Sequence, residues 1–250
     1  MKKITFITIL LFVNFLANGQ LNKKYQAVVK KFINCIKTNN INKLKTMVIY
    51  PLPRVYPLPP VKNKQDFVKR YNNIFDDSLK NIIIKSNIDN DWSDVGFRGI
   101  MLNNGLIWID YDGNLMSITI LSKTERKKRK KLIDEDRHNI NKSLKNFIAP
   151  VIIMNTQKYK IRIDKISNNS YRLALWPFDS SMKNNPDIVI KNGDYRIEGS
   201  EHNEIYSFKK DNYEYECFIN SYYEGSGKGS FVIYKNNDII YNEDAKINGY

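Results

Sequence analysis

Apolar residues recur at spacings of three and four in the first part of the chain, a pattern that is typical of amphipathic helices. A first helix is predicted to begin after Asn22, a capping residue type, with an apolar face of Tyr25, Val29, Phe32 and Ile36. A second helix is expected over residues 42–48. Two more are predicted to start at Asn63 and at Asp76 or Asp77, with apolar faces of Phe67, Tyr71, Ile74 and Phe75 and of Leu79, Ile82 and Ile83.

The pattern then changes to short apolar strands. They are expected over residues 95–102, 106–111 and 115–121, and the turns between them contain Gly105 and Gly113. Before them, residues 50–60 hold five prolines and are predicted to be extended, because proline fixes φ and removes a hydrogen-bond donor. This segment is either a rigid connection that packs its Leu and Tyr side chains or a site for a partner.

Helices followed by a curved antiparallel meander make residues 21–121 resemble the cone-shaped α+β fold of the nuclear transport factor 2-like superfamily. The tract from Trp92 to Trp108, WSDVGFRGIMLNNGLIW, is similar to tracts in small exported bacterial proteins. The resemblance implies a pocket between helices and sheet, which in that superfamily serves small-molecule enzymes, immunity or assembly modules and scaffolds. The pocket candidates here are Tyr71, Trp108 and Asp110. The enzymatic members usually place an Asp, His or Tyr in the cone, and this half of the chain has no histidine.

A long connecting helix is predicted from the capping pair Ser122 and Glu125 to about Phe147, with Ile133, Ile140 and Leu144 on its buried side. Its first turns hold six consecutive cations, which are Arg126, Lys127, Lys128, Arg129, Lys130 and Lys131. Successive helical residues are about 100° apart, so this run surrounds the helix and must be solvated. It is either a site for anionic polymers or lipids or a soluble connector.

From residue 149 onward, short strands separated by turns predict a β-sandwich or a β-barrel. The expected organisation is thus a signal segment (1–19), an α+β part (20–121), a basic linker helix (122–148) and a β-sandwich part (149–250). The alternation of tyrosine and glutamate in residues 213–217 indicates that most tyrosines of this part pack in its core. Trp176 is the candidate for a surface aromatic residue that could bind carbohydrate.

Residues 1–19 have the order of a cleavable export signal. Lys2 and Lys3 precede an apolar run over residues 4–15, and Ala17 and Gly19 form a small-x-small site before Gln20. Twelve helical residues rise only about 18 Å, which is short of the roughly 30 Å hydrocarbon core of a membrane. The mature chain is therefore expected to be periplasmic or secreted, with no membrane span, and without the cysteine that a lipoprotein needs at the cleavage site.

The formal net charge of +14 favours attraction to anionic envelope polymers or lipid headgroups, although abundant Lys, Asn and Ile are also typical of AT-rich coding sequences. Cys35 and Cys217 are too few for a structural zinc site and are expected to be buried apolar residues, with a disulfide between them as the alternative. His138 and His202 are expected to be solvated. Residues 89–94 lack the glycine of a calcium loop and are expected to cap a turn. The sequence predicts no cofactor and no metal.

No catalytic set emerges from these residues, and three functions stay open. The first is non-catalytic binding, assembly or inhibition, with another envelope or extracellular protein as partner. The second is a small-molecule enzyme that uses the cone pocket. The third is binding of an anionic polymer or lipid through the basic helix, while nucleic acid is not expected as a partner.

Overall fold

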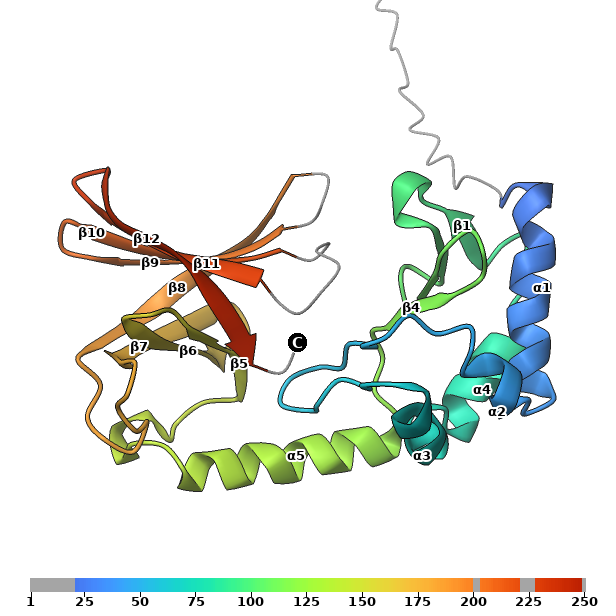
Figure 1. Cartoon of the computed structure of the whole chain (residues 1–250), viewed down its shortest axis with the longest axis horizontal. Helices are drawn as coiled ribbons and strands as arrows, with labels where there is room; N and C mark the ends of the chain where they lie inside the picture. The colour runs from blue at the N-terminus through green and yellow to red at the C-terminus, as the bar shows by residue number, and fades with distance from the viewer. Residues whose placement is uncertain (1–20, 200–202, 221–227, 249–250) are drawn as a thin grey trace, which may run out of the picture.

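A computed structural model of the chain describes residues 21–199, 203–220 and 228–248 (Figure 1). An N-terminal α+β part and a C-terminal β-barrel stand at opposite ends of one helix, α5 (Figure 1). The predicted order of helices on an antiparallel sheet, a connecting helix and an all-β part is confirmed. The predicted signal segment lies outside the described residues. Within them, no helix has the length and apolar character that a membrane crossing requires.

The N-terminal part packs four helices against a four-stranded antiparallel sheet of order β1-β2-β3-β4. The helices are α1 (Lys23–Lys37), α2 (Ile41–Leu44), α3 (Lys64–Ile74) and α4 (Asp77–Lys85). The strands are β1 (Trp92–Asp94), β2 (Ile100–Leu102), β3 (Ile107–Ile109) and β4 (Leu115–Ile118). The side chains of Asn22, Asn63 and Asp76 cap α1, α3 and α4, as predicted.

Two elements of this part differ from their prediction. Helix α2 ends at Leu44, because the chain beyond it turns so that Val48 forms a parallel bridge with Leu115. The predicted strand over residues 95–102 is interrupted by the 3₁₀ turn η1 (Gly96–Arg98), so that β1 and β2 form a hairpin. Gly99 makes this possible, since its φ is 87° and a Cβ atom there would lie 2.4 Å from the carbonyl oxygen of Ile109.

The C-terminal part is a closed barrel of eight antiparallel strands in the order β10-β11-β12-β5-β6-β7-β8-β9. The strands are β5 (Ala149–Asn155), β6 (Tyr159–Ser167), β7 (Ser170–Pro177), β8 (Ile188–Glu198), β9 (Asn203–Lys210), β10 (Tyr213–Ile219), β11 (Lys228–Lys235) and β12 (Asp238–Asn248). Three residue pairs between β12 and β5 close it, among them Ile247 with Met154. Of the two predicted architectures the barrel is therefore correct, and the β-sandwich is wrong because this pairing joins the first and last strands.

Strand β8 is bent at Asn192, whose φ of 61° accommodates a bulge in the pairing with β7. Such bulges supply the local bend that a closed barrel needs. The barrel interior is filled by side chains that include Ile161, Phe208 and Phe231, as expected for eight strands.

Helix α5 (Lys123–His138) ends nine residues before the predicted end at Phe147. The chain leaves the helix because the Asn141 side chain instead caps the 3₁₀ turn η2 (Lys142–Leu144) and donates to the carbonyl of Lys183. The residues predicted for the buried side of the helix are nevertheless buried. They belong to a third apolar cluster, which lies on the outer face of the barrel and is separate from the N-terminal core and the barrel interior. Its members are Ile133, Ile140, Leu144, Phe147, Ala149, Ala174 and Trp176.

Candidate functional site

The pocket that the sequence predicts within the N-terminal part is not formed by its three candidate residues. Tyr71 is 1% exposed and lies in the core, where its ring stacks on Phe75 at a centroid distance of 5.2 Å. Trp108 alternates along β3 with the buried core residues Ile107 and Ile109. Because successive strand residues point to opposite faces, Tyr71 and Trp108 lie on opposite sides of the sheet.

Asp110, the third candidate, stabilises a turn. Its Oδ1 accepts hydrogen bonds from the backbone N–H groups of Asp112 and Asn114, at 2.9 and 2.7 Å. Its Oδ2 accepts a third hydrogen bond from Nδ2 of Asn114 at 2.8 Å. The carboxylate is thus engaged by its own loop, and the structure does not bring Asp110 together with both Tyr71 and Trp108.

Trp176, the predicted surface aromatic residue, is also placed differently. Its side chain is fully buried in the third apolar cluster, and its indole Nε1 donates to the carbonyl of Asn184 at 3.1 Å. The outer face of β7 was expected to meet solvent, but α5 and the segment after it cover that face. Trp176 therefore cannot present its ring to carbohydrate in this fold.

The residues weighed for metal or disulfide chemistry have ordinary structural surroundings. Cys35 and Cys217 are buried and unpaired, as the sequence favoured. Asp94, in the predicted turn cluster, accepts from the backbone of Gly96 at 3.0 Å. His138 is exposed at the end of α5, whereas His202 lies outside the described residues. Across residues 21–199, 203–220 and 228–248, no group of three His, Cys, Asp or Glu side chains is arranged to hold a metal ion.

Helix α5 is joined to the N-terminal part by a buried ion pair at its first turn. Glu125 is 3% exposed and accepts from Nε and Nη2 of Arg54, the first of these at 2.9 Å. Arg54 comes from the proline segment (residues 50–60) and also donates to the carbonyls of Ile118 and Ile120 at the end of the sheet. Because charged hydrogen bonds of this kind are strong and directional, they fix the start of α5 against the N-terminal part.

A second buried network joins the last turns of α5 to the barrel. Arg162 on β6 is fully buried and donates to both carboxylate oxygens of Asp136, at 2.9 and 2.5 Å. Its Nε donates to Asp164 at 2.8 Å, and Asp164 also accepts from Nη2 of Arg172 at 2.5 Å. Helix α5 is therefore held at both ends by buried arginine–carboxylate pairs. These pairs fix the N-terminal part and the barrel relative to the helix.

Tyr56 links the proline segment to the same network. Its carbonyl accepts from Nε of Arg129 on α5 at 2.8 Å. Burial, together with the nearby carboxylates of Asp136 and Asp164, raises the pKa of Tyr56 to about 12. The proline segment thus packs along α5 as a rigid connection, which was the first of its two interpretations.

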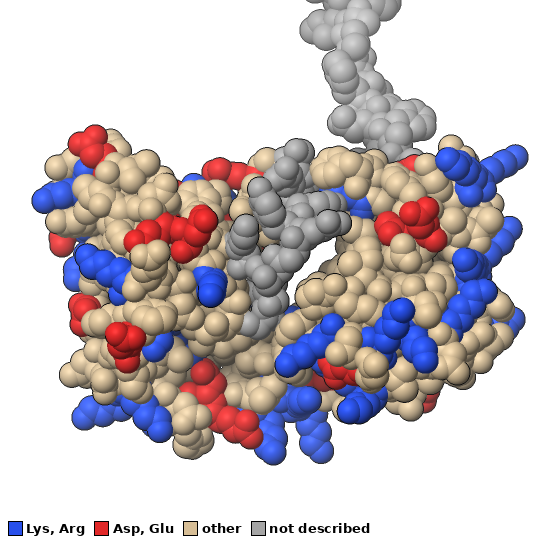
Figure 2. Space-filling view, viewed as in Figure 1, with Lys and Arg blue, Asp and Glu red and all other residues tan. Residues whose placement is uncertain are grey.

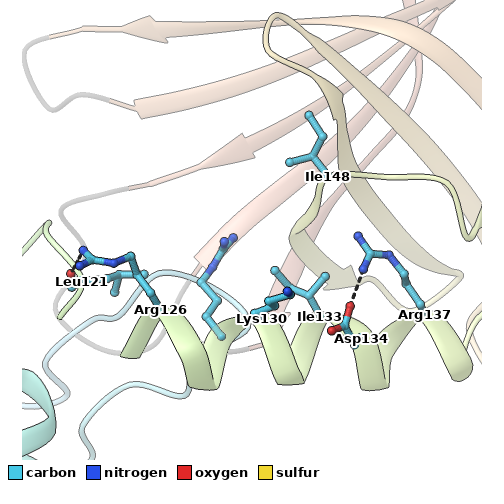
Figure 3. A pocket seen from close by; sticks show the side chains of 8 residues that line it. Leu121, Arg126, Lys130, Ile133, Asp134, Arg137 and Ile148 are labelled. Carbon is cyan, nitrogen blue, oxygen red and sulfur yellow. Dashed lines mark hydrogen bonds and ion pairs between the residues drawn. The ribbon is translucent and has the colours of Figure 1, made fainter. Parts of the chain in front are cut away.

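A groove of about 370 Å³ runs along the face of α5 that looks toward the barrel (Figure 3). Four cationic side chains line it, namely Arg126, Arg129, Lys130 and Arg137. Its apolar lining comes from Leu121 before the helix, Ile133 within it and Ile148 after it. Since the two ends of the groove belong to segments on either side of α5, the groove depends on both buried networks.

Three of the four cations are arginines held by the surrounding chain. Arg126 donates from Nη1 to the carbonyl of Leu121 at 2.5 Å, and Arg129 donates to Tyr56. Arg137 donates to the carboxylate of Asp134 at 2.6 Å and to the carbonyl of Phe147 at 2.8 Å. Each guanidinium has five N–H donors, so each keeps donors for a ligand while its position is already restricted.

The remaining residues of the basic run point elsewhere. Lys127 and Lys131 line a shallow neighbouring depression with Glu135 and His138, and Lys128 is exposed. Lys130 and Asp134 stand between the two hollows and line both. In the space-filling view, Lys and Arg side chains project from the edge of the molecule where α5 lies (Figure 2). The prediction that the run is solvated all round the helix is confirmed except at Arg129, which is half-buried.

Sequence reasoning missed several residues of this site. Arg54 and Tyr56 were read only as parts of an extended segment, and Arg137 and Ile148 carried no motif. A charged residue within the apolar proline segment was the one local indication that Arg54 has a buried partner. Comparisons of the chain with models of known families, with curated proteins and with solved structures gave no match.

Proposed function

We propose that this chain is a non-catalytic binding protein that holds an anionic partner through the basic face of α5. The observation that carries the proposal is the groove itself. Its lining contains four cationic side chains and one carboxylate, that of Asp134. That carboxylate is already paired with Arg137. The lining has an excess of three positive charges, and three of its cations are positioned by hydrogen bonds before any ligand arrives.

Fixed cations favour binding because little side-chain freedom is lost when the ligand is bound. A solvated run of flexible lysines would lose more, so a merely basic surface is a weaker binding site than this groove. The two buried ion pairs of α5 contribute in the same way, since they keep Leu121 and Ile148 at fixed positions relative to the helix. Binding through α5 thus unites the first and third functions that the sequence left open.

The alternative of a small-molecule enzyme rested on Tyr71, Trp108 and Asp110 as pocket residues. Tyr71 and Trp108 lie on opposite sides of the sheet, and Asp110 stabilises a turn, so these residues no longer support it. The resemblance to the nuclear transport factor 2-like superfamily stays a prediction. Export is part of the proposal and rests on the composition of residues 1–19. In the periplasm or outside the cell, a basic groove would meet anionic lipids, polymers and acidic protein surfaces.

The test compares two variants with the same change in charge. In the first, Arg126, Lys127, Lys128, Lys130 and Lys131 are replaced by Gln, while Arg129 is kept because it holds Tyr56. In the matched control, five exposed lysines of α1 are replaced by Gln, at positions Lys23, Lys24, Lys30, Lys31 and Lys37.

Retention on heparin and on vesicles with anionic headgroups is measured against salt concentration. The proposal expects the α5 variant to elute at markedly lower salt than the control variant, because the loss is local to the site. Equal elution of the two variants would show that net charge alone governs binding, and the proposal would be wrong.

A further inference from the structure

We propose that the groove of α5 takes a phosphate monoester group carried on an apolar chain. This inference rests on the proposed function and assigns the chemical class of the ligand within it. The groove combines two kinds of lining that a single amphiphilic ligand would satisfy. Cations lie along the helix, and apolar side chains stand at both margins, the half-buried Leu121 and the exposed Ile148.

The number and type of the donors favour phosphate over a carboxylate. Three guanidiniums and one ammonium offer many N–H donors toward one space, whereas a carboxylate has two oxygens and one charge. A phosphate monoester has three terminal oxygens and a charge of about −1.5 to −2 at neutral pH. It therefore suits both the many donors of the lining and its excess of three positive charges better than a carboxylate does.

Hydrogen bonds to backbone carbonyls restrict the positions of two of these arginines. The carbonyl of Leu121 accepts from Arg126, and that of Tyr56 accepts from Arg129. Lys130 is exposed and belongs to the same lining, so its flexible ammonium can close on an oxygen that the guanidiniums do not reach. Asp134 does not repel the ligand, because Arg137 neutralises it at 2.6 Å.

The apolar lining indicates that the ligand extends beyond the phosphate. Ile148 is 50% exposed in the structure, and it faces the groove opposite α5 (Figure 3). Covering such a side chain contributes roughly 25 cal/mol for each Å² of apolar surface removed from water. A volume of about 370 Å³ is also at the lower end of the roughly 300–1,000 Å³ typical of small-molecule sites, so a stretch of chain fits beside the headgroup.

The first experiment is isothermal titration calorimetry, in which the protein is titrated with three probes. They are dihexanoyl phosphatidic acid, inorganic phosphate and dihexanoyl phosphatidylcholine, whose headgroup carries no net charge. Phosphatidic acid is expected to bind at least tenfold more tightly than either other probe. If inorganic phosphate binds as tightly as phosphatidic acid, the apolar chain does not contribute to binding. If phosphatidylcholine binds as tightly, the charge of the phosphate monoester does not contribute. Either result would contradict the inference.

The second experiment compares Lys130→Gln with Lys128→Gln. Both lysines are exposed and both changes remove one charge from α5, but residues two apart on a helix point to opposite faces. Lys130→Gln is expected to weaken binding of phosphatidic acid about tenfold, which corresponds to about 1.4 kcal/mol for one charged hydrogen bond. Lys128→Gln is expected to change it less than twofold.

A third variant, Ile148→Asn, tests the apolar contact separately. It is expected to weaken phosphatidic acid severalfold and to leave the affinity for inorganic phosphate unchanged. If Lys128→Gln and Lys130→Gln weaken binding equally, the groove is not the site and this inference fails, while anion binding through α5 stands. If the unmodified protein binds no anionic probe and is not retained on heparin, the proposed function itself fails.

Discussion

The buried pair of Arg54 and Glu125 gives the sharpest energetic prediction. In Glu125→Gln the side chain keeps its shape but loses its charge, and the Arg54 guanidinium is left buried with the carbonyls of Ile118 and Ile120 as its other acceptors. Removing one partner of a buried pair costs about 3–5 kcal/mol. Because the amide oxygen still accepts one hydrogen bond, we expect a loss of about 3 kcal/mol in the free energy of unfolding.

The assay is urea-induced unfolding at neutral pH, followed by circular dichroism. Glu135→Gln is the matched control, since its pair with Lys131 has an N–O distance of 3.7 Å and both side chains are more than half exposed. An exposed pair of this kind contributes less than about 1 kcal/mol. The double variant Arg54→Met with Glu125→Met should be more stable than Glu125→Gln, because it leaves no unpaired charge in the interior.

A loss below about 1 kcal/mol for Glu125→Gln would refute the reasoning, because the pair would then be solvated or unimportant for the position of α5. A double variant less stable than the single one would refute it as well. That result would show that packing around Arg54, and not the charge pair, connects the proline segment to the helix.

Three further predictions follow from single sites. Gly193→Ala should destabilise the chain by about 1–3 kcal/mol in the same unfolding assay, because a Cβ atom there would lie 2.1 Å from the Phe208 ring; an unchanged midpoint would contradict the packing. Both thiols should be silent to Ellman's reagent in the native protein and give two equivalents after unfolding, since burial raises the pKa of Cys217; no reaction after unfolding would indicate a disulfide. Burial raises the pKa of Tyr56 to about 12, whereas tyrosine in an unfolded chain ionises near 10. The unfolded state therefore loses this proton first, and stability present below pH 10 should be lost as the pH rises toward 12. Tyr56→Phe should make the decline in unfolding free energy between about pH 10 and 12 shallower, and identical slopes for the two proteins would contradict the assignment.

Local signals in the sequence predicted the starts of elements well. The caps at Asn22, Asn63 and Ser122 each act on a backbone N–H within three residues, so the whole interaction is contained in a short window. The turns at Asn103 and Asn104, both with positive φ, are recognisable for the same reason. The order of helices and strands followed from these windows.

Long-range pairing could not be predicted in this way. Ile247 pairs with Met154 across more than ninety residues, and only that pairing distinguishes a closed barrel from a sandwich. Alternation along β6 places Arg162 and Asp164 on the outer face of the barrel, where charged residues are expected to meet water. They are fully buried because α5 covers them, and α5 is placed by Asp136, which lies far from them in the sequence.

The site was predictable in part. The cations of α5 formed a visible run, and the rule that such a run surrounds a helix was correct for most of its members. The sequence did not show that Arg126, Arg129 and Lys130 share one groove, because Leu121 and Ile148 of its lining come from the segments before and after α5. Tyr71, Trp108, Asp110 and Trp176 were misplaced because residue type and spacing do not fix which side of a sheet is covered.

Helix α5 fixes the two folded parts relative to each other and so maintains the groove. The most direct test is a distance measurement by double electron–electron resonance. Spin labels are placed at Lys30→Cys on α1 and at Asn236→Cys in the turn between β11 and β12, both of them exposed positions. We expect one narrow distance distribution in the otherwise unmodified chain, which broadens when Glu125→Gln and Asp136→Asn are introduced together. A broad distribution before these changes, or a narrow one that survives them, would contradict this role of α5.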